Sequence, residues 1–249
     1  MFEEYFSRHV RSFGDAALPS AVCVPAFGDD SGAYLPLAGT SVIERFRLVL
    51  TELPGFGGTE PLTGPTTLEA LSAYVAVLAE RENAEIVMAH SVGSITASLA
   101  ARRAGGLIKT IISLEGNLTP ADAYYSGAAA DFSDAEDFKA TFLKRLEAIQ
   151  RDDAGVARFR KAVARADATA LWRLGCDARS FSDKADPGAV LCESARVIYL
   201  YDPDNTPPQT QQWIAAHDIE AHKLDGVSHW MMCEQPAMTA AAIIRAFDA

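Results

Sequence analysis

The chain has 249 residues, of which 49% are hydrophobic and 22% are charged, so it is long enough to bury one sizeable globular core. This composition argues against extended disorder, collagen and coiled coil. With 22 Lys and Arg against 33 Asp and Glu, the formal net charge is −11. That balance disfavours a general binder of nucleic acid or anionic membranes, because phosphate contacts need clustered cations.

The N-terminal stretch and the cysteines bear on the compartment. Residues 1–14 (MFEEYFSRHVRSFG) are charged and mixed, without the apolar segment of a secretion signal. No apolar run in the chain approaches the roughly 20 residues that a membrane helix needs. The cysteines form no C-x-x-C pair and have no zinc-ligand spacing to a histidine; they are Cys23, Cys176, Cys192 and Cys233. We expect reduced thiols in a cytoplasmic protein.

Short β-branched runs alternate with helical patterns along the chain, which predicts an α/β fold with a mostly parallel sheet flanked by helices. The runs are continuously apolar, as in strands that are covered on both faces. The N-terminal stretch looks like a helix, so we expect six main strands. They are predicted at 21–26, 46–53, 85–90, 108–115, 195–201 and 219–224, and the helices between them at 66–83, 91–105, 206–218 and 234–249.

Residues 119–190 interrupt this alternation, because they contain no convincing strand. They show amphipathic helical patterns instead, for example over 134–153 and 156–174. We therefore expect a helical cap inserted between two strands of one sheet. The predicted organisation is a core α/β domain formed by residues 1–118 and 191–249, with the cap over residues 119–190.

A small-x-Ser-x-Gly pattern, AHSVG at 89–93, lies between the predicted strand 85–90 and the predicted helix 91–105. Such a strand–turn–helix junction holds a nucleophile in a strained turn, where only small residues fit two positions before and after it. The helix N-terminus and the Val92 N–H favour negative charge there. We predict that Ser91 is a nucleophile; the alternative is a serine that only caps the helix.

A nucleophilic serine needs a base, and His229 is the histidine best placed to be one. It follows the last predicted strand, in a loop that leads into the final helix and opens at the same sheet edge as Ser91. The alternative is a loop histidine packed against Trp230. The other histidines are expected to be exposed, structural or turned away from the nucleophile; they are His9, His90, His217 and His222.

The base in turn needs a carboxylate that orients it. The predicted strand 195–201 is followed by Asp202-Pro203-Asp204, a loop at the same edge and one strand before the histidine. We predict Asp204 as this acid. Glu115, at the end of the predicted strand 108–115, is the second candidate, and Asp202 is the third.

The chain order Ser91, Asp204, His229, with a helical insertion after the strand that follows the nucleophile, resembles the α/β-hydrolase fold superfamily. Three further segments resemble its loops: VPAFGDDSG its oxyanion turn, LTELPGFGGTEPL its D-x-P-G-x-G-x-S loop and SHWMMCEQP its histidine loop. The resemblance implies an oxyanion hole formed by the Phe27 and Val92 N–H groups. Two departures are that Pro25-Ala26 replaces His-Gly and Glu52 replaces Asp.

The resemblance implies a cofactor-independent serine hydrolase that cleaves an ester, lactone or thioester of a small, partly apolar molecule. No metal or cofactor is expected, since GFGG at 55–58 lacks the third glycine and the helix of a dinucleotide site. The negative charge disfavours CoA thioesters. Aromatic residues of the cap and the histidine loop are expected to form the substrate wall: Tyr124, Tyr125, Trp172 and Trp230, with Phe132 and Phe181 as further candidates.

Two other functions stay open on the same scaffold. One is a cofactor-free lyase, oxygenase or C–C bond hydrolase that uses the same residues differently. The other is a non-catalytic, receptor-like protein that keeps the cap as a ligand pocket. The expected partner is a small molecule, not a nucleic acid or a membrane, and a homodimer is left open.

Overall fold

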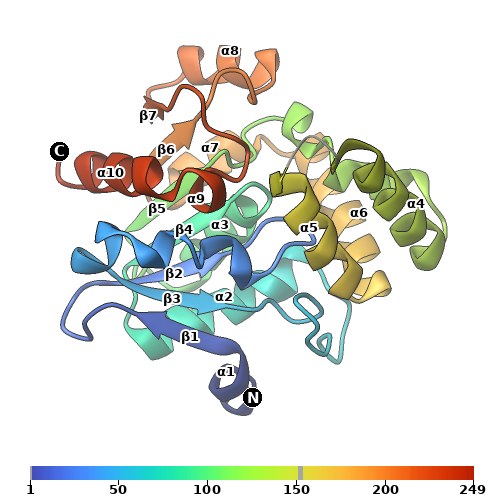
Figure 1. Ribbon diagram of the computed structural model, residues 1–249, viewed down its shortest axis with the longest axis horizontal. Helices are drawn as coiled ribbons and strands as arrows, with labels where there is room; N and C mark the ends of the chain where they lie inside the picture. Colours follow the sequence, from blue (N-terminus) through green and yellow to red (C-terminus); the bar gives the residue numbers. More distant parts are fainter. Residues whose placement is uncertain (1, 151–153) are drawn as a thin grey trace.

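A seven-stranded sheet runs through the centre of the computed structural model, which describes residues 2–150 and 154–249 (Figure 1). The strand order is β1-β3-β2-β4-β5-β6-β7, and every pair is parallel except β1 with β3. This arrangement confirms the predicted fold class. The strands are β1 Val10–Phe13, β2 Ser20–Val24, β3 Arg47–Thr51, β4 Ile86–His90, β5 Thr110–Leu114, β6 Arg196–Tyr201 and β7 Glu220–Lys223.

The N-terminal stretch differs from its prediction. It forms a helix only over Glu3–His9 (α1) and then continues as β1, which pairs antiparallel with β3 at the edge of the sheet. The sheet therefore has seven strands rather than six. A four-residue edge strand with Arg11 and Ser12 exposed carries little hydrophobic signal, so the pairing with β3 decides its conformation.

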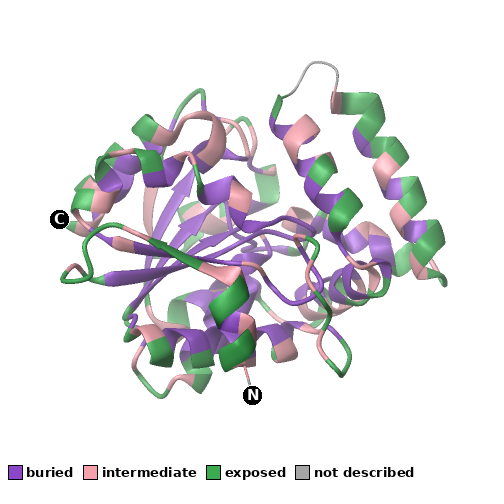
Figure 2. Ribbon diagram, turned by 60° about the horizontal axis from the view of Figure 1, so that its bottom comes forward, coloured by how far each residue is buried: buried purple, intermediate pink, exposed green. Residues whose placement is uncertain are grey.

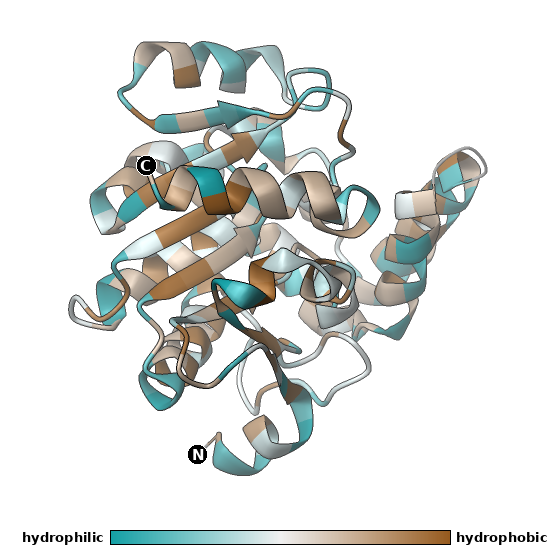
Figure 3. Cartoon of the chain, turned by 60° about the vertical axis from the view of Figure 1, so that its left-hand side comes forward, coloured by the Kyte–Doolittle hydropathy of each residue, from teal (hydrophilic) through white to brown (hydrophobic). Residues whose placement is uncertain are grey.

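Helices cover both faces of the sheet, whose five inner strands are almost entirely buried (Figure 2). The packed helices α2 (Leu68–Glu82), α3 (Gly93–Arg103) and α7 (Pro187–Ser194) form one cover. The other cover contains α10 (Pro236–Phe247) and the 3-10 helices η1 (Ser31–Tyr34), η2 (Leu37–Gly39) and η3 (Ser41–Glu44). Figure 3 shows the apolar strands between these helices, which turn hydrophilic residues outward. Beyond β6, α8 (Pro208–Ala216) precedes β7, and α9 (Met231–Glu234) precedes α10.

The predicted helical insertion lies between β5 and β6. It contains η4 (Pro120–Ala123), η5 (Ser126–Asp131), α4 (Ala135–Ile149), α5 (Ala154–Arg165) and α6 (Ala168–Lys184). The stretch predicted as one helix over 156–174 is two helices, because Asp167 accepts a hydrogen bond from the Ala170 N–H and so caps the start of α6. Residues 151–153, at the end of the predicted helix 134–153, lie outside the described residues.

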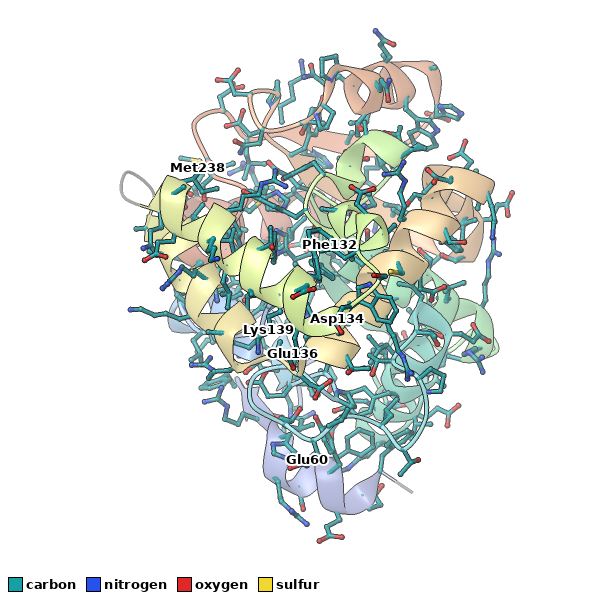
Figure 4. All side chains as sticks on the ribbon, turned by 90° about the vertical axis from the view of Figure 1, so that its right-hand side faces the viewer. Glu60, Phe132, Asp134, Glu136, Lys139 and Met238 are labelled. Atoms are coloured by element: carbon teal, nitrogen blue, oxygen red, sulfur yellow. The ribbon has the colours of Figure 1, made fainter. Side chains whose placement is uncertain are left out.

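Within the insertion, α4 and α5 lie side by side at one end of the molecule (Figures 1 and 4). Lys139, near the start of α4, donates hydrogen bonds of 3.1 Å to the Ala164 carbonyl and 2.5 Å to the Ala166 carbonyl. These carbonyls lie at the C-terminal end of α5, where the positive charge of Lys139 stabilises the helix dipole. The contact ties the two helices into one layer.

No helix among residues 2–150 and 154–249 combines the length and the apolar character needed to cross a membrane.

Candidate active site

Ser91 occupies a strained turn between β4 and α3. Its φ is 53°, a left-handed conformation that non-glycine residues adopt at a cost. Its N–H donates to the Leu114 carbonyl of the neighbouring β5 at 3.1 Å, which holds the turn against the sheet. A Cβ on Gly93 would come within 2.7 Å of the Pro25 carbonyl oxygen, so only glycine fits at that position. This close approach is the physical reason for the small residue that the sequence pattern contains.

His229 lies against Glu115. The imidazole Nδ1 is 2.6 Å from Glu115 Oε2, and the two side chains are 14% and 5% exposed. The carboxylate accepts, so Nδ1 carries the proton and Nε2 is left as the basic nitrogen. Glu115 Oε1 accepts from the Asp202 N–H at 3.1 Å and from Asn205 Nδ2 at 3.3 Å. Both oxygens of the Glu115 carboxylate are therefore held by hydrogen bonds.

The predicted position of Asp204 beside His229 is corrected by this contact. Asp204 is exposed, and no hydrogen bond within the described residues joins its carboxylate to the imidazole. Its N–H instead donates to Asp202 Oδ1 at 2.8 Å. The other oxygen of Asp202 accepts from the Val227 N–H at 2.9 Å, two residues before His229. The loop after β6 thus supports the histidine loop through Asp202 and does not supply the partner of the imidazole.

Glu115 reaches His229 because of its backbone and its strand. It follows β5, which lies between β4 and β6, so it starts closer to Ser91 than any residue after β6. Its φ of 43° turns the chain sharply at the end of the strand, while its N–H stays bonded to the Leu200 carbonyl at 2.9 Å. The longer glutamate side chain then spans the remaining gap. The signal in the sequence was the carboxylate at the strand end; the positive φ could not be read from it.

The side chain of His90 contacts the backbone of His229. It is fully buried, and its Nε2 lies 2.9 Å from the His229 carbonyl. A carbonyl only accepts, so His90 donates from Nε2. Burial, and next the neighbouring His229, hold the pKa of His90 well below its ordinary value. His90 is therefore a neutral donor that fixes the backbone of the histidine loop.

This burial predicts a pH dependence of stability. In the unfolded chain His90 takes up a proton below its ordinary pKa of 6.5, whereas in the folded chain it stays neutral. The free energy of unfolding should therefore fall with falling pH, by up to about 1.4 kcal/mol per pH unit below that value. His90→Gln keeps an N–H donor and should remove this part of the slope. Urea denaturation of both proteins at pH 7 and pH 5 measures the change in the free energy of unfolding between the two pH values. An equal change in both proteins would contradict a buried, neutral His90.

Phe27 and Val92, whose amides the resemblance assigns to the oxyanion hole, lie at the cavity of Ser91. Both residues line one cavity together with Ser91 and His229. Within the part of the chain that the structure describes, neither amide donates a hydrogen bond to a protein acceptor. Two free N–H groups beside a serine at a helix start can bind an oxyanion. The sequence analysis named both residues as oxyanion donors on the basis of the resemblance, and that role stays a prediction.

The cavity is narrow, and five of its eleven lining residues are Phe, Tyr or Trp. Its volume is about 10 Å³, room for about one water molecule. The cavity as it stands therefore has no room for a substrate of several heavy atoms, so part of its wall must move to admit one. The cavity is lined by Ala26, Phe27, Ser91, Val92, Asp122, Tyr124, Tyr125, Ser126, Phe159, His229 and Trp230.

Three of the four predicted wall residues, Tyr124, Tyr125 and Trp230, line the cavity. Trp172 does not; its Nε1 donates to the Phe132 carbonyl at 3.0 Å, inside the insertion. Phe159, which was not predicted from the sequence, also lines the cavity, and its ring centre lies 5.2 Å from that of Trp230.

No group of three His, Cys, Asp or Glu side chains within residues 2–150 and 154–249 is arranged to hold a metal ion. The four cysteines are unpaired, with Cys23 buried and Cys192 exposed. Burial raises the pKa of the Cys23 thiol, so it is unreactive.

The sequence profile of the Alpha/beta hydrolase family matches residues 21–242 of the chain, which covers most of its length. No curated protein is significantly similar to the chain in sequence.

Solved structures share the fold over almost the whole chain. The enol-lactonase from Burkholderia xenovorans LB400 is 19% identical, with a TM-score of 0.71 over 97% of this chain and 96% of that one. An esterase from Thermogutta terrifontis is 17% identical, with a TM-score of 0.73 over 96% and 92%. An AqdC variant solved with its substrate, for ring-cleavage of the Pseudomonas quinolone signal, is 17% identical, with a TM-score of 0.75 over 96% and 94%. At these identities the likeness shows a shared fold.

Proposed function

Because the chain belongs to the alpha/beta hydrolase family, we propose that it is a serine hydrolase that cleaves an ester, lactone or thioester of a small, partly apolar substrate. The observation that carries this proposal is the contact of 2.6 Å between His229 Nδ1 and Glu115 Oε2 at a cavity that Ser91 also lines. A serine, an oriented imidazole and a buried carboxylate are the parts that acyl transfer needs.

The proposed reaction has two halves. Ser91 Oγ attacks the substrate carbonyl carbon while His229 Nε2 takes the hydroxyl proton. The Phe27 and Val92 N–H groups bind the oxyanion of the tetrahedral intermediate, and His229 returns the proton to the leaving group. Water then repeats both steps on the acyl-serine. Throughout, Glu115 holds the imidazole in one tautomer and stabilises its positive charge.

The cavity wall supports an apolar acyl group. Five of its lining residues are Phe, Tyr or Trp, and the helical insertion that we take as the cap provides Tyr124, Tyr125 and Phe159. The described lining residues include no Lys or Arg, and Asp122 adds a carboxylate. An uncharged ester or lactone suits such a wall better than an anionic substrate.

A fluorophosphonate probe combined with a substrate panel tests this function. The probe should label the wild-type protein and not Ser91→Ala, because it reacts with an activated serine. p-Nitrophenyl esters and lactones of short to medium chain length should then be hydrolysed. Labelling together with turnover of diketones alone would favour a C–C bond hydrolase.

Two other results would point away from hydrolysis. Ring cleavage of an aromatic substrate without hydrolysis would favour a cofactor-free lyase or oxygenase. The likeness to the AqdC variant, which was solved for ring-cleavage of its substrate, is the reason to test this class. Ligand binding with neither labelling nor turnover would favour a receptor.

A further inference from the structure

One face of α5 packs against the residues around the Ser91 cavity. Arg158, Phe159 and Val163 lie three, four and eight residues after Gly155 and so share one side of the helix. A Cβ on Gly155 would lie 2.9 Å from Trp230 Cε3, and one on Gly28 would lie 3.1 Å from Val163 Cγ2. The helix therefore contacts both the turn that carries Phe27 and the residue after His229.

A buried ion pair lies at the centre of this face. Arg158 Nη1 and Nη2 bind the two oxygens of Asp29 at 2.9 and 2.6 Å. The Asp29 side chain is 0% exposed and the Arg158 side chain 23%. Burial raises the pKa of Asp29, and Arg158 opposes this rise. Two parallel charge-assisted bonds of this kind fix the orientation of both groups as well as their distance.

Asp29 connects three segments that are far apart in the sequence. It lies two residues after Phe27, and its N–H donates back to the Ala26 carbonyl at 3.1 Å. Its Oδ2 accepts from Trp230 Nε1 at 3.2 Å, next to His229. Its side chain also binds Arg158 of α5, and its Oδ1 accepts from the Asp30 N–H at 2.8 Å. Asp29 thus joins the proposed oxyanion turn, the histidine loop and the insertion through one carboxylate.

We propose that Arg158 is a positioning residue, which holds the Phe27 turn and Trp230 in their reactive arrangement through Asp29 when α5 closes over Ser91. This inference rests on the proposed serine hydrolase function. Since Phe159 of α5 lines the narrow cavity, we infer that α5 moves when a substrate enters, and this movement would part Arg158 from Asp29. The oxyanion turn is then fully held only when the site is closed, so reaction in the open form is suppressed.

The neighbouring pair of Arg165 with Asp30 supports the same closure at its rim. Asp30 is 5% exposed on its side chain, whereas Arg165 is 56% exposed. Water screens that pair, so we assign the positioning to the buried contact of Arg158.

Arg158→Met is the principal test, since it keeps the apolar stem and removes the charge. With a p-nitrophenyl ester, kcat per fluorophosphonate-titrated serine should fall about 10²-fold, the scale of a misplaced catalytic geometry, with a much smaller change in KM. Arg158→Lys should recover part of the loss because it keeps the charge without the fork. The double variant Asp29→Asn/Arg158→Met should be no worse than the poorer single variant.

Arg160→Met is the matched control. It removes the same charge from the same helix, but Arg160 Nη2 faces Glu147 of α4 at 3.6 Å, within the insertion. It should leave kcat near the wild-type value. If Arg158→Met only lowers the unfolding temperature, with kcat per titrated serine unchanged, or if it matches Arg160→Met, the proposal is overturned. If Arg158→Met does not fold, Arg158→Lys decides, and wild-type kcat in that variant also overturns it.

Hydrogen exchange without substrate separates this proposal from the proposed function. Amides of residues 24–30 and 154–165 should exchange faster in Arg158→Met than in the wild type, and not in Arg160→Met. Unchanged exchange in both segments would overturn the coupling. A wild-type protein that neither reacts with the probe nor hydrolyses esters would refute the hydrolase, and the exchange result would still stand.

Discussion

Ser91→Ala should lower kcat by roughly 10⁴- to 10⁶-fold, the range found for removal of nucleophiles in other enzymes of this mechanism. The change deletes one oxygen at a cavity wall and no packed carbon, so the free energy of unfolding should stay close to that of the wild type. Steady-state kinetics on the best ester or lactone of the panel, with urea denaturation of the same preparations, measures both quantities.

Ser98→Ala is the matched control for this variant. Ser98 lies on α3, the helix that Ser91 precedes, and its hydroxyl donates to the Ser94 carbonyl at 2.7 Å, so the change costs one buried hydrogen bond. Its kcat should stay within a few fold of the wild type.

His229→Ala should lower kcat about as much as Ser91→Ala, and the double variant should be little worse than either, because the two residues act as one unit. If kcat of Ser91→Ala stayed within a few fold of the wild-type value, the assignment of Ser91 as the nucleophile would be refuted.

The second large effect is expected at the acid. Glu115→Gln should lower kcat by up to about 10⁴-fold, because the amide can present an N–H to His229 Nδ1 and favour the wrong tautomer. Two further contacts of Glu115, with the Asp202 N–H and Asn205 Nδ2, use its other oxygen and can persist in glutamine. The loss should therefore lie in kcat more than in stability. Kinetics and thermal unfolding of the variant separate the two.

Asp204→Asn is the comparison that tests this assignment. Asp204 is exposed, and its N–H contact with Asp202 does not involve its own carboxylate. Its kcat should fall less than about tenfold, since it loses at most a solvated interaction. If Asp204→Asn is the damaging change and Glu115→Gln the mild one, the loop after β6 supplies the acid and the proposed triad is refuted.

The contrast between Ser91 and Glu115 shows how far local patterns reach. The small residues around Ser91, and the strand and helix beside it, are properties of one short segment, so the sequence predicted the turn and the structure has it at φ 53°. The partner of His229 depends on how two loops meet. Both Glu115 and Asp204 follow strands at the same edge, and the sequence favoured the one that lies nearer to His229 along the chain.

The errors in the fold have a similar origin. The strand β1 forms because β3 has an unpaired edge with which it can form hydrogen bonds. Its four residues include two exposed polar side chains and therefore show no clear strand pattern in the sequence. The break between α5 and α6 was readable in principle, since Asp167 precedes Ala168 at a helix start. Periodicity continued across the break and concealed it, because Phe159 and Leu171 both face inward.

By itself, the sequence determined the alternation of strands and helices, the strained turn at Ser91 and the sheet edge where His229 lies, because hydrophobic periodicity and steric limits act over a few residues. Only the tertiary structure decided that Glu115 binds His229 and that Asp29 joins α5 to Trp230 and the Phe27 turn. Those contacts link residues up to 201 positions apart. Their geometry follows from strand order, backbone twist and the packing of the insertion, which no single segment encodes.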